Sequence, residues 1–330
     1  MRILVTGGAG FIGSHFARRL AAAGDDVVVL DKLTYAGNLA NLHGISHDFR
    51  GGDIVDPTGV AAAARGCEAI VNFAAETHVD RSISSGADFL RTNVVGVHTL
   101  LEEARASELR FVHVSTDEVY GDLPPGRSSK EGDPLHPSSP YSAAKAGGDL
   151  LVLSYVRTHG VDALITRGSN TYGPNQFPEK LLSLFITNAL DGEPLPLYGD
   201  GRQIRDWLHV EDHCAGIELV LREGTAGEIY NVGGGEEVEN REITERVLEL
   251  TGTDESLIRR VDDRPGHDRR YSLDTAKLDS LGWEKRWTLA EGLPATVEWY
   301  RENRHWWEPI KRSDVFRAYY ERQYATLLAD

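Results

Sequence analysis

The stretch Ile3-Leu4-Val5-Thr6-Gly7-Gly8-Ala9-Gly10-Phe11-Ile12-Gly13 decides the fold. An apolar run is followed at once by closely spaced glycines and then by a helical pattern, so it predicts a buried strand, a tight turn and a helix. At such a junction, glycines let backbone N–H groups approach a pyrophosphate. The spacing is GxxGxxG rather than GxGxxG, and glycines alone also fit an ordinary turn, so the flanking strand and helix supply the context that the motif requires.

The alternation of strand and helix patterns continues through the first half of the chain. Strands are predicted over 2–6, 27–31, 68–74, 110–115 and 162–167, and helices over 11–23, 84–107 and 140–159. This alternation predicts an α/β fold with a doubly wound parallel sheet of the Rossmann type. We expect a dinucleotide-binding domain over 1–168 and a smaller mixed α/β substrate lobe over 169–330, with the chain returning to the first domain near 204–232.

Composition and charge narrow the classes of partner. The chain has 330 residues with 35 basic and 51 acidic side chains, a formal net charge of −16. That charge repels nucleic acid and anionic membrane surfaces, and no apolar run reaches the ~18 residues that a membrane span needs. Cys67 and Cys214 lie far apart without CxxC spacing, so we expect reduced structural thiols and a cytoplasmic location.

Acidic and small residues at later strand ends extend the expected cofactor site. Asp31 ends the second predicted strand about 20 residues after the glycines, where a carboxylate accepts the adenosine ribose hydroxyls and repels a 2′-phosphate. NAD+ is therefore favoured over NADP, although Asp31 also fits a solvated strand end. Asp53-Ile54 follows a short third strand and suits the adenine, and Ala74-Ala75 offers small side chains where the cofactor backbone passes.

Tyr141 and Lys145 lie four residues apart on the predicted helix over 140–159, so they share a face. A free phenol is a poor base near neutral pH, but a nearby ammonium favours the phenolate. Lys145 also has donors for the nicotinamide ribose. A YxxxK spacing is common on helix surfaces, and its position downstream of the glycine turn favours the catalytic interpretation.

Thr116, Asp117 and Glu118 end the fifth predicted strand, at the sheet edge where open α/β sheets bind ligands. Adjacent acids on a loop ordinarily form a solvated turn. Beside Tyr141 they suggest a general acid and a general base, because burial and neighbouring negative charge can hold a proton on one of them.

The motifs together resemble the extended short-chain dehydrogenase/reductases and, within them, the dTDP-glucose 4,6-dehydratases. The resemblance runs through nearly the whole chain, over 6–13, 72–82, 116–118, 141–145, 170–175 and 264–268. The Thr-Asp-Glu string discriminates best. Related epimerases generally have serine followed by small or apolar residues there, and GDP-mannose dehydratases differ at the position of Asp117 and usually prefer NADP.

The resemblance implies a reaction with an internal redox cycle. Tyr141, assisted by Lys145 and Thr116, would take the 4-hydroxyl proton of dTDP-glucose while the C4 hydride passes to NAD+. Glu118 would then remove the C5 proton as Asp117 protonates the departing 6-hydroxyl. Hydride return to C6 would give dTDP-4-keto-6-deoxyglucose, a step of deoxysugar biosynthesis, and would regenerate NAD+.

The resemblance also implies the binding residues. The cofactor would contact Gly7, Gly10, Phe11, Ile12, Gly13, Asp31, Lys32, Thr34, Asp53, Ile54, Ala74, Ala75, Thr92, Tyr141, Lys145 and Thr171. Nucleotide and sugar would contact His78, Thr116, Asn170, Lys180, Leu181, Pro196, Tyr198, Arg205, Asn240, Arg264 and His267. Among the basic residues, the guanidinium groups of Arg205 and Arg264 suit the diphosphate best. The histidines show no metal spacing, and a homodimer through the predicted helices over 84–107 and 140–159 is expected.

Three rival functions stay open at this stage. The sequence does not identify the residues that would distinguish thymine from uracil, so a UDP-glucose 4,6-dehydratase is the nearest rival function. A nucleotide-sugar 4-epimerase is the second. Outside enzymes, the rival is a nucleotide-sensing protein that keeps the fold without the chemistry. Such a protein would be expected to lack Tyr141 or Lys145, and both are present.

Overall fold

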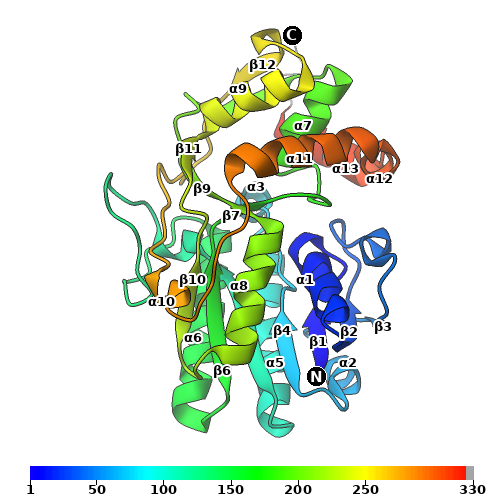
Figure 1. The fold of residues 1–330 in the computed structure, drawn as a ribbon, viewed down its shortest axis with the longest axis vertical. Coiled ribbons are helices and arrows are strands. Elements are labelled where there is room, and N and C mark those ends of the chain that lie inside the picture. The colour runs from blue at the N-terminus through cyan, green and yellow to red at the C-terminus, as the bar shows by residue number, and fades with distance from the viewer. Residues whose placement is uncertain (325–330) are drawn as a thin grey trace.

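The computed structural model describes residues 1–324, and its centre is a seven-stranded parallel sheet in the order β10-β6-β5-β4-β1-β2-β3 (Figure 1). The strands span β1 (Arg2–Thr6), β2 (Asp26–Asp31), β3 (Asp48–Gly51), β4 (Ala69–Asn72), β5 (Arg110–Thr116), β6 (Ala163–Gly168) and β10 (Ile229–Val232). The chain adds β2 and β3 on one side of β1 and β4 to β6 on the other. The order therefore reverses between β1 and β4, which is where such sheets form a ligand crevice, and the predicted fold class is confirmed.

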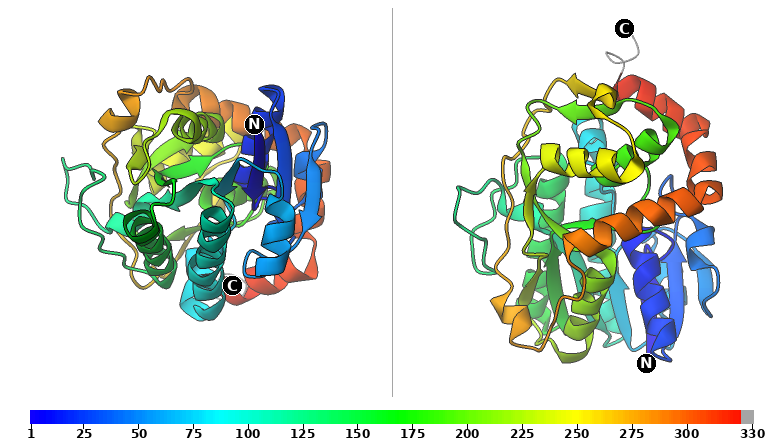
Figure 2. Two further views of the ribbon diagram at one scale, coloured as in Figure 1. Left: turned by 90° about the horizontal axis from the view of Figure 1, so that it is seen from below. Right: turned by 45° about the horizontal axis from the view of Figure 1, so that its top comes forward.

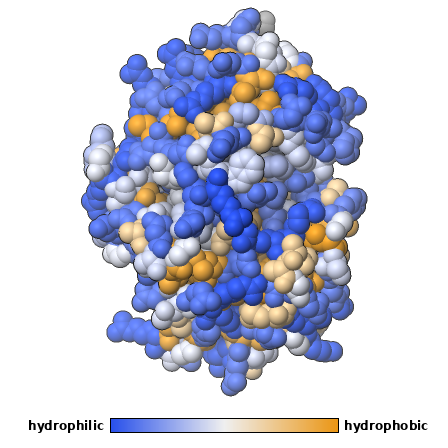
Figure 3. All heavy atoms as spheres, in the orientation of Figure 1, coloured by the Kyte–Doolittle hydropathy of each residue, from blue (hydrophilic) through white to orange (hydrophobic). Residues whose placement is uncertain are grey.

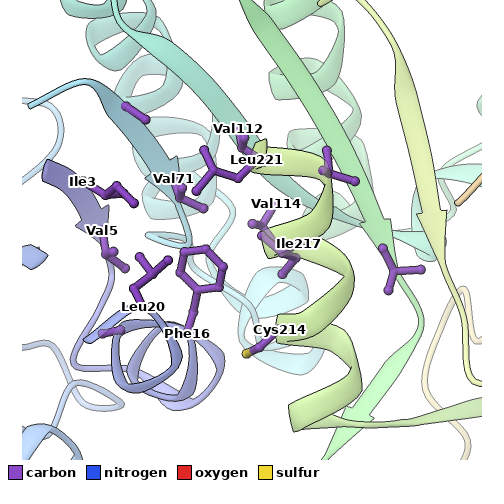
Figure 4. Packing of buried hydrophobic residues seen from close by; sticks show 14 of the residues in the cluster. Ile3, Val5, Phe16, Leu20, Val71, Val112, Val114, Cys214, Ile217 and Leu221 are labelled. Atoms are coloured by element: carbon purple, nitrogen blue, oxygen red, sulfur yellow. The ribbon is translucent and has the colours of Figure 1, made fainter. Parts of the chain in front are cut away.

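Helices cover both faces of this sheet. They span α1 (Phe11–Ala22), α2 (Pro57–Ala64), α5 (Val97–Ala106), α6 (Pro140–His159) and α8 (Val210–Glu223). On one face, Phe16 of α1 and Ile217 of α8 meet β-branched residues of the strands such as Val71 (Figure 4). On the other face, α2, α5 and α6 cover the sheet with residues such as Leu100 and Val152. Burial on both faces explains the continuous apolar character of the strands.

The long helix predicted over 84–107 is wrong in its detail. The structure breaks this stretch into α3 (Val79–Ser84), α4 (Ala87–Leu90), a π-helical turn η2 (Arg91–Gly96) and α5. A Cβ on Gly96 would lie 2.4 Å from Cδ1 of Ile54, so this glycine permits close packing against the segment after β3. The predicted helix over 140–159 is confirmed as α6, which begins at a Ser139 capping box and ends at Gly160 with φ of 68°.

The second half of the chain builds a smaller lobe above the carboxyl edge of the large sheet (Figure 2). Its strands are β7 (Asn170–Tyr172), β8 (Leu195–Tyr198), β9 (Ile204–His209), β11 (Glu237–Glu239) and β12 (Ile258–Val261), in sheets ordered β11-β9-β7 and β12-β8. Its helices are α7 (Leu181–Asp191), α9 (Asn240–Thr251), α11 (Leu289–Glu302), α12 (Arg304–Lys311) and α13 (Asp314–Gln323). The lobe has its own apolar core, centred on residues such as Phe185, Val247 and Trp307.

The chain crosses between the two parts more than once. After β9 in the small lobe, α8 packs on the large sheet and β10 pairs in parallel with β6. A short helix, α10 (Ala276–Asp279), follows and contributes Leu278 to the same core. The domain boundary at residue 168 stays a prediction.

The surface is mainly polar. On the face drawn in Figure 3, hydrophilic residues predominate and apolar residues form small separate groups. Within residues 1–324, every helix falls short of the length and apolar character that a bilayer crossing requires.

Candidate active site

One cavity follows the carboxyl edge of the large sheet from the start of α1 to the start of α7. All sixteen residues that the sequence assigned to the cofactor line this cavity, as do Thr116, Asp117 and Glu118. Asn170, Lys180 and Leu181 from the expected substrate set also line it. The structure thus gathers residues from β1 to the start of α7 around one space.

The glycine turn is shaped for a close approach of backbone. A Cβ on Gly7, where φ is 68°, would lie 2.6 Å from the Ala74 nitrogen, and one on Gly13 would lie 2.3 Å from the Gly7 oxygen. No side chain caps the N-terminus of α1, whose first turn also lacks acidic residues. Unoccupied N–H groups at a helix N-terminus fit a diphosphate, so these residues suit a dinucleotide.

Asp31 and the loop after it form the far end of the cavity. The Asp31 carboxylate accepts hydrogen bonds from the Ala9 nitrogen at 2.9 Å and the Leu33 nitrogen at 2.8 Å. Burial raises the pKa of Asp31, and these two amides oppose the rise. Lys32 Nζ pairs with Asp53 Oδ2 at 2.8 Å, so two of the expected cofactor residues hold each other in place.

Tyr141 and Lys145 project from the first turns of α6 into the cavity. Lys145 Nζ donates to the Val114 carbonyl at 2.8 Å, and burial lowers the pKa of this lysine to about 8. Burial and the charge of Glu118 raise the pKa of Tyr141 above its ordinary value, while the Thr116 hydroxyl lowers it. Activation of Tyr141 by Lys145 stays a prediction, and it has to act against burial and the nearby acid.

Asp117 and Glu118 open a short turn, η3 (Asp117–Tyr120), directly after β5. The Thr116 hydroxyl accepts from the Glu118 nitrogen at 3.3 Å and donates to Asp117 Oδ1 at 3.2 Å. Asp117 Oδ2 is buried and has no hydrogen-bond partner among residues 1–324. Burial, then the charges of Glu118 and Asp206, raise the pKa of Asp117 well above its ordinary range, which favours the protonated carboxyl group.

Glu118 has a different environment. Burial raises its pKa as well, but the positive charges of Arg264, Lys180 and Arg205 oppose that rise. Asp117 is therefore favoured as the protonated member of the pair and Glu118 as the ionised one. Two adjacent carboxyl groups with separated pKa values are the usual arrangement for a general acid and a general base.

The other expected substrate residues lie outside the lining of the cavity: His78, Pro196, Tyr198, Arg205, Asn240, Arg264 and His267. Several of them meet at Asp80. Arg264 Nη1 lies 3.5 Å from Asp80 Oδ1, and the Tyr198 hydroxyl donates to Asp80 Oδ2 at 3.1 Å. The nitrogen Nε of Arg264 is buried without a hydrogen-bond partner in the part of the chain that the structure describes. Their contact with substrate stays a prediction.

Sequence reasoning missed some residues that line the cavity. His213 on α8 is buried, and its Nδ1 lies 2.7 Å from the Thr171 hydroxyl. Ser115, Gln176 and Trp207 also contribute to the lining. The position of Ser115 beside Thr116 was a usable signal, whereas nothing in the sequence around His213 distinguishes it from a residue of an amphipathic helix.

A tyrosine and a lysine four residues apart on one helix, beside a glycine turn that fits a dinucleotide, are the defining features of the short-chain dehydrogenases/reductases. Residues 4–296 match the family described as GDP-mannose 4,6 dehydratase. The chain belongs to this family and, within it, to the group of the dTDP-glucose 4,6-dehydratases. The resemblance drawn from the motifs is confirmed.

Individual relatives support this assignment over nearly the whole chain. A dTDP-glucose 4,6-dehydratase of Streptomyces niveus is 54% identical over 326 residues, which are 95% of this chain and 97% of the relative. The crystal structure of DesIV, a dTDP-glucose 4,6-dehydratase from Streptomyces venezuelae with NAD bound, is 55% identical, covers 94% of this chain and 100% of its own, and has a TM-score of 0.92. A Thermus thermophilus UDP-glucose 4-epimerase in complex with NAD is 34% identical, with a TM-score of 0.86 and coverage of 91% and 99%.

Proposed function

We propose that this chain is a hydro-lyase that converts dTDP-glucose into dTDP-4-keto-6-deoxyglucose with bound NAD+, for deoxysugar biosynthesis. The observation that carries the proposal is the pair of unlike carboxyl groups, Asp117 and Glu118, on the same cavity as Tyr141. Oxidation at C4 needs only the tyrosine and the cofactor, whereas elimination of water across C5 and C6 also needs an acid and a base.

Tyr141 acts on the 4-hydroxyl of the sugar. The Thr116 side chain lowers the pKa of the buried phenol, and the Lys145 ammonium is fixed by the Val114 carbonyl one helical turn away. The glycine turn and Asp31 would hold NAD+, which would supply a hydride acceptor for C4 and later a hydride donor for C6. Tyr141 acts in its ionised form, the phenolate, and accepts the hydroxyl proton as the ketone forms.

Glu118 and Asp117 carry out the elimination. The 4-ketone acidifies the C5 proton, which passes to the Glu118 carboxylate. Asp117 gives its proton to the 6-hydroxyl, so the leaving group departs as water. Glu118 would return its proton to C5 as hydride adds to C6. Tyr141 would release the proton that it took from the 4-hydroxyl and Asp117 would take one up, so all three groups would regain their starting charge.

Lys180, Arg205 and Arg264 provide positive charge for the nucleoside diphosphate. The charges of all three oppose the rise that burial causes in the pKa of Glu118, which supports their position on the sugar side of the site. Three basic side chains gathered in an otherwise acidic protein favour a diphosphate at this end of the site.

We propose a homodimer formed through α4, η2 and α6. Leu90, Val95 and Leu150 on these helices are between 52% and 58% exposed, which is unusual for large apolar side chains. We also propose a cytosolic location, in line with the free, buried thiols of Cys67 and Cys214. Light scattering of Leu150→Lys and fractionation of cells test these two points.

Incubation with dTDP-glucose, UDP-glucose and GDP-mannose tests the function. Loss of one water from dTDP-glucose without net NADH supports the proposal. Dehydration of UDP-glucose at a higher kcat/KM would make the protein a UDP-glucose 4,6-dehydratase, and an isobaric product would make it an epimerase. Absence of turnover with tight nucleotide binding would favour a sensing role.

A further inference from the structure

Arg81 on α3 lies between two aromatic rings from distant parts of the chain. Its guanidinium carbon Cζ is 4.1 Å from the ring centroid of Tyr35 and 4.1 Å from that of Tyr319. Nε and Nη2 of Arg81 both donate to Glu179 Oε2, at 3.1 and 2.9 Å. One side chain therefore joins the loop after β2, the segment before α7 and the helix α13.

This cluster is costly to break. Glu179 is only 5% exposed, and burial raises its pKa while the charge of Arg81 opposes the rise. Removing the guanidinium would leave a buried carboxylate without its partner. Stacked cations and two-donor ion pairs both depend on the flat shape of arginine, so lysine does not replace it.

Tyr35 belongs to the loop that covers the far end of the cofactor cavity. Its neighbours Thr34, Ala36 and Gly37 line the cavity, whereas Tyr35 itself contacts Arg81 outside the lining. The two ends of the loop are anchored on the glycine-turn side, because Leu33 N donates to Asp31 and Asn38 N donates to the Ala9 carbonyl at 3.0 Å. Between these anchors, Tyr35 ties the middle of the loop to the rest of the protein through the Arg81 stack and through an edge contact with the Phe177 ring, 5.4 Å between centroids.

We propose that Arg81 is a positioning residue that holds the loop over 33–37 closed on the adenosine end of the cofactor site, so that NADH stays bound until its hydride returns to the sugar. This inference rests on the proposed function, because only a reaction with an internal redox cycle needs the reduced cofactor to wait. Early release would leave the unsaturated keto sugar without a hydride donor.

The same cluster reaches the sugar end of the site. Lys180, next to Glu179 in the chain, lines the cavity and donates from Nζ to the Thr77 carbonyl at 2.7 Å. Nε2 of His78 lies 3.2 Å from the backbone carbonyl oxygen of Glu179. Closure of the cofactor loop and the position of Lys180 therefore depend on one ion pair.

The test measures release of NADH from the loaded protein by stopped-flow fluorescence, without any sugar. Arg81→Lys and Tyr35→Ala should each release NADH about 10- to 100-fold faster, the range expected for loss of a stacked, charge-assisted contact. Tyr35→Phe keeps the ring contacts with Arg81 and Phe177 but loses the hydroxyl beside Glu179, so it should release NADH more slowly than Tyr35→Ala. Lys311→Met is the matched control. Lys311 Nζ pairs with Asp191 at 3.0 Å and with Glu193 at 2.9 Å, and neither ion pair belongs to the cofactor cavity.

Wild-type release rates in both Arg81→Lys and Tyr35→Ala would overturn the proposal. If either variant fails to fold, Tyr319→Leu removes one face of the stack and is held to the same criterion. A second readout uses dTDP-glucose: Arg81→Lys should leave free NADH and unsaturated keto sugar in solution. Release of NADH is measured without sugar, so the release rates test Arg81 even if the proposed function is wrong. If the wild-type chain dehydrates dTDP-glucose and the variants release NADH at the wild-type rate, only the positioning role is refuted.

Discussion

Replacing Asp117 with asparagine should separate oxidation of the sugar from loss of water. Asparagine keeps the shape of the side chain and the oxygen that accepts from Thr116, but it cannot give up a proton. General acid catalysis contributes roughly 10²–10⁴-fold in rate. Since Asp117 Oδ2 has no hydrogen-bond partner within residues 1–324 and Glu118 is assigned the role of the base, we expect the upper part of that range, about 4–5.5 kcal/mol in activation free energy.

The Asp117→Asn protein should still oxidise C4 and then stall with NADH bound, which rapid-mixing absorbance detects. The stalled sugar should exchange its C5 hydrogen with deuterated solvent, because Glu118 remains. Glu118→Gln is the companion variant and should stall without that exchange. Product formation by Asp117→Asn at the wild-type rate, or C5 exchange in Glu118→Gln, would refute the division of roles.

The fold should tolerate the Asp117→Asn change. Asp117 has a higher pKa in the folded protein than in the unfolded chain. Its contribution to the free energy of unfolding is therefore fully present below the unfolded-state pKa and is lost as pH rises through the folded-state pKa. At neutral pH the carboxyl group therefore opposes folding. Thermal unfolding at neutral pH should show an unchanged or higher Tm, and a marked fall would mean that the lost activity is structural.

Three further changes test other parts of the site. Tyr141→Phe should slow hydride transfer by at least about 10²-fold in single-turnover absorbance, without build-up of NADH. Gly13→Ala should abolish cofactor binding, measured by NAD extracted from purified protein, because its Cβ would lie 2.3 Å from the Gly7 oxygen; Gly132→Ala meets nothing within 4 Å and should bind normally. On the acid side, kcat/KM should fall as Glu118 is protonated, with a midpoint above 4.5 because burial raises the pKa of Glu118, and Glu118→Gln should lack this limb.

Local signals explain why much of the first half could be predicted. Ser139-Pro140 begins α6 and Gly160 ends it, so both bounds can be obtained from neighbouring residues. The cofactor residues follow strand ends, and parallel strands bring their ends to one sheet edge whatever the loops do. The same logic placed Thr116 to Glu118 on the cavity.

The remainder depends on contacts between residues far apart in sequence. The folded chain brings together Asp80, Tyr198 and Arg264, and no residue spacing or periodicity in the sequence predicts this contact. The predicted helix over 84–107 is interrupted at Ser85, whose backbone is extended, and its π-helical turn ends at Gly96, which packs closely against Ile54, some forty residues earlier. The raised pKa of Tyr141 likewise follows from burial and from the approach of Glu118, neither of which a helix-face argument contains.

The pairing of β10 with β6 bears on how the protein is made. During translation, a nascent chain that ends before residue 229 has β6 as a bare sheet edge. Before α8 emerges, part of the apolar sheet face that α1 and α8 share is uncovered. The core of the dinucleotide-binding half is completed by α8 and β10. The ribosome must therefore first synthesise β7 to β9 of the small lobe. Fragments cut at the middle of the sequence should therefore aggregate rather than fold as an autonomous half.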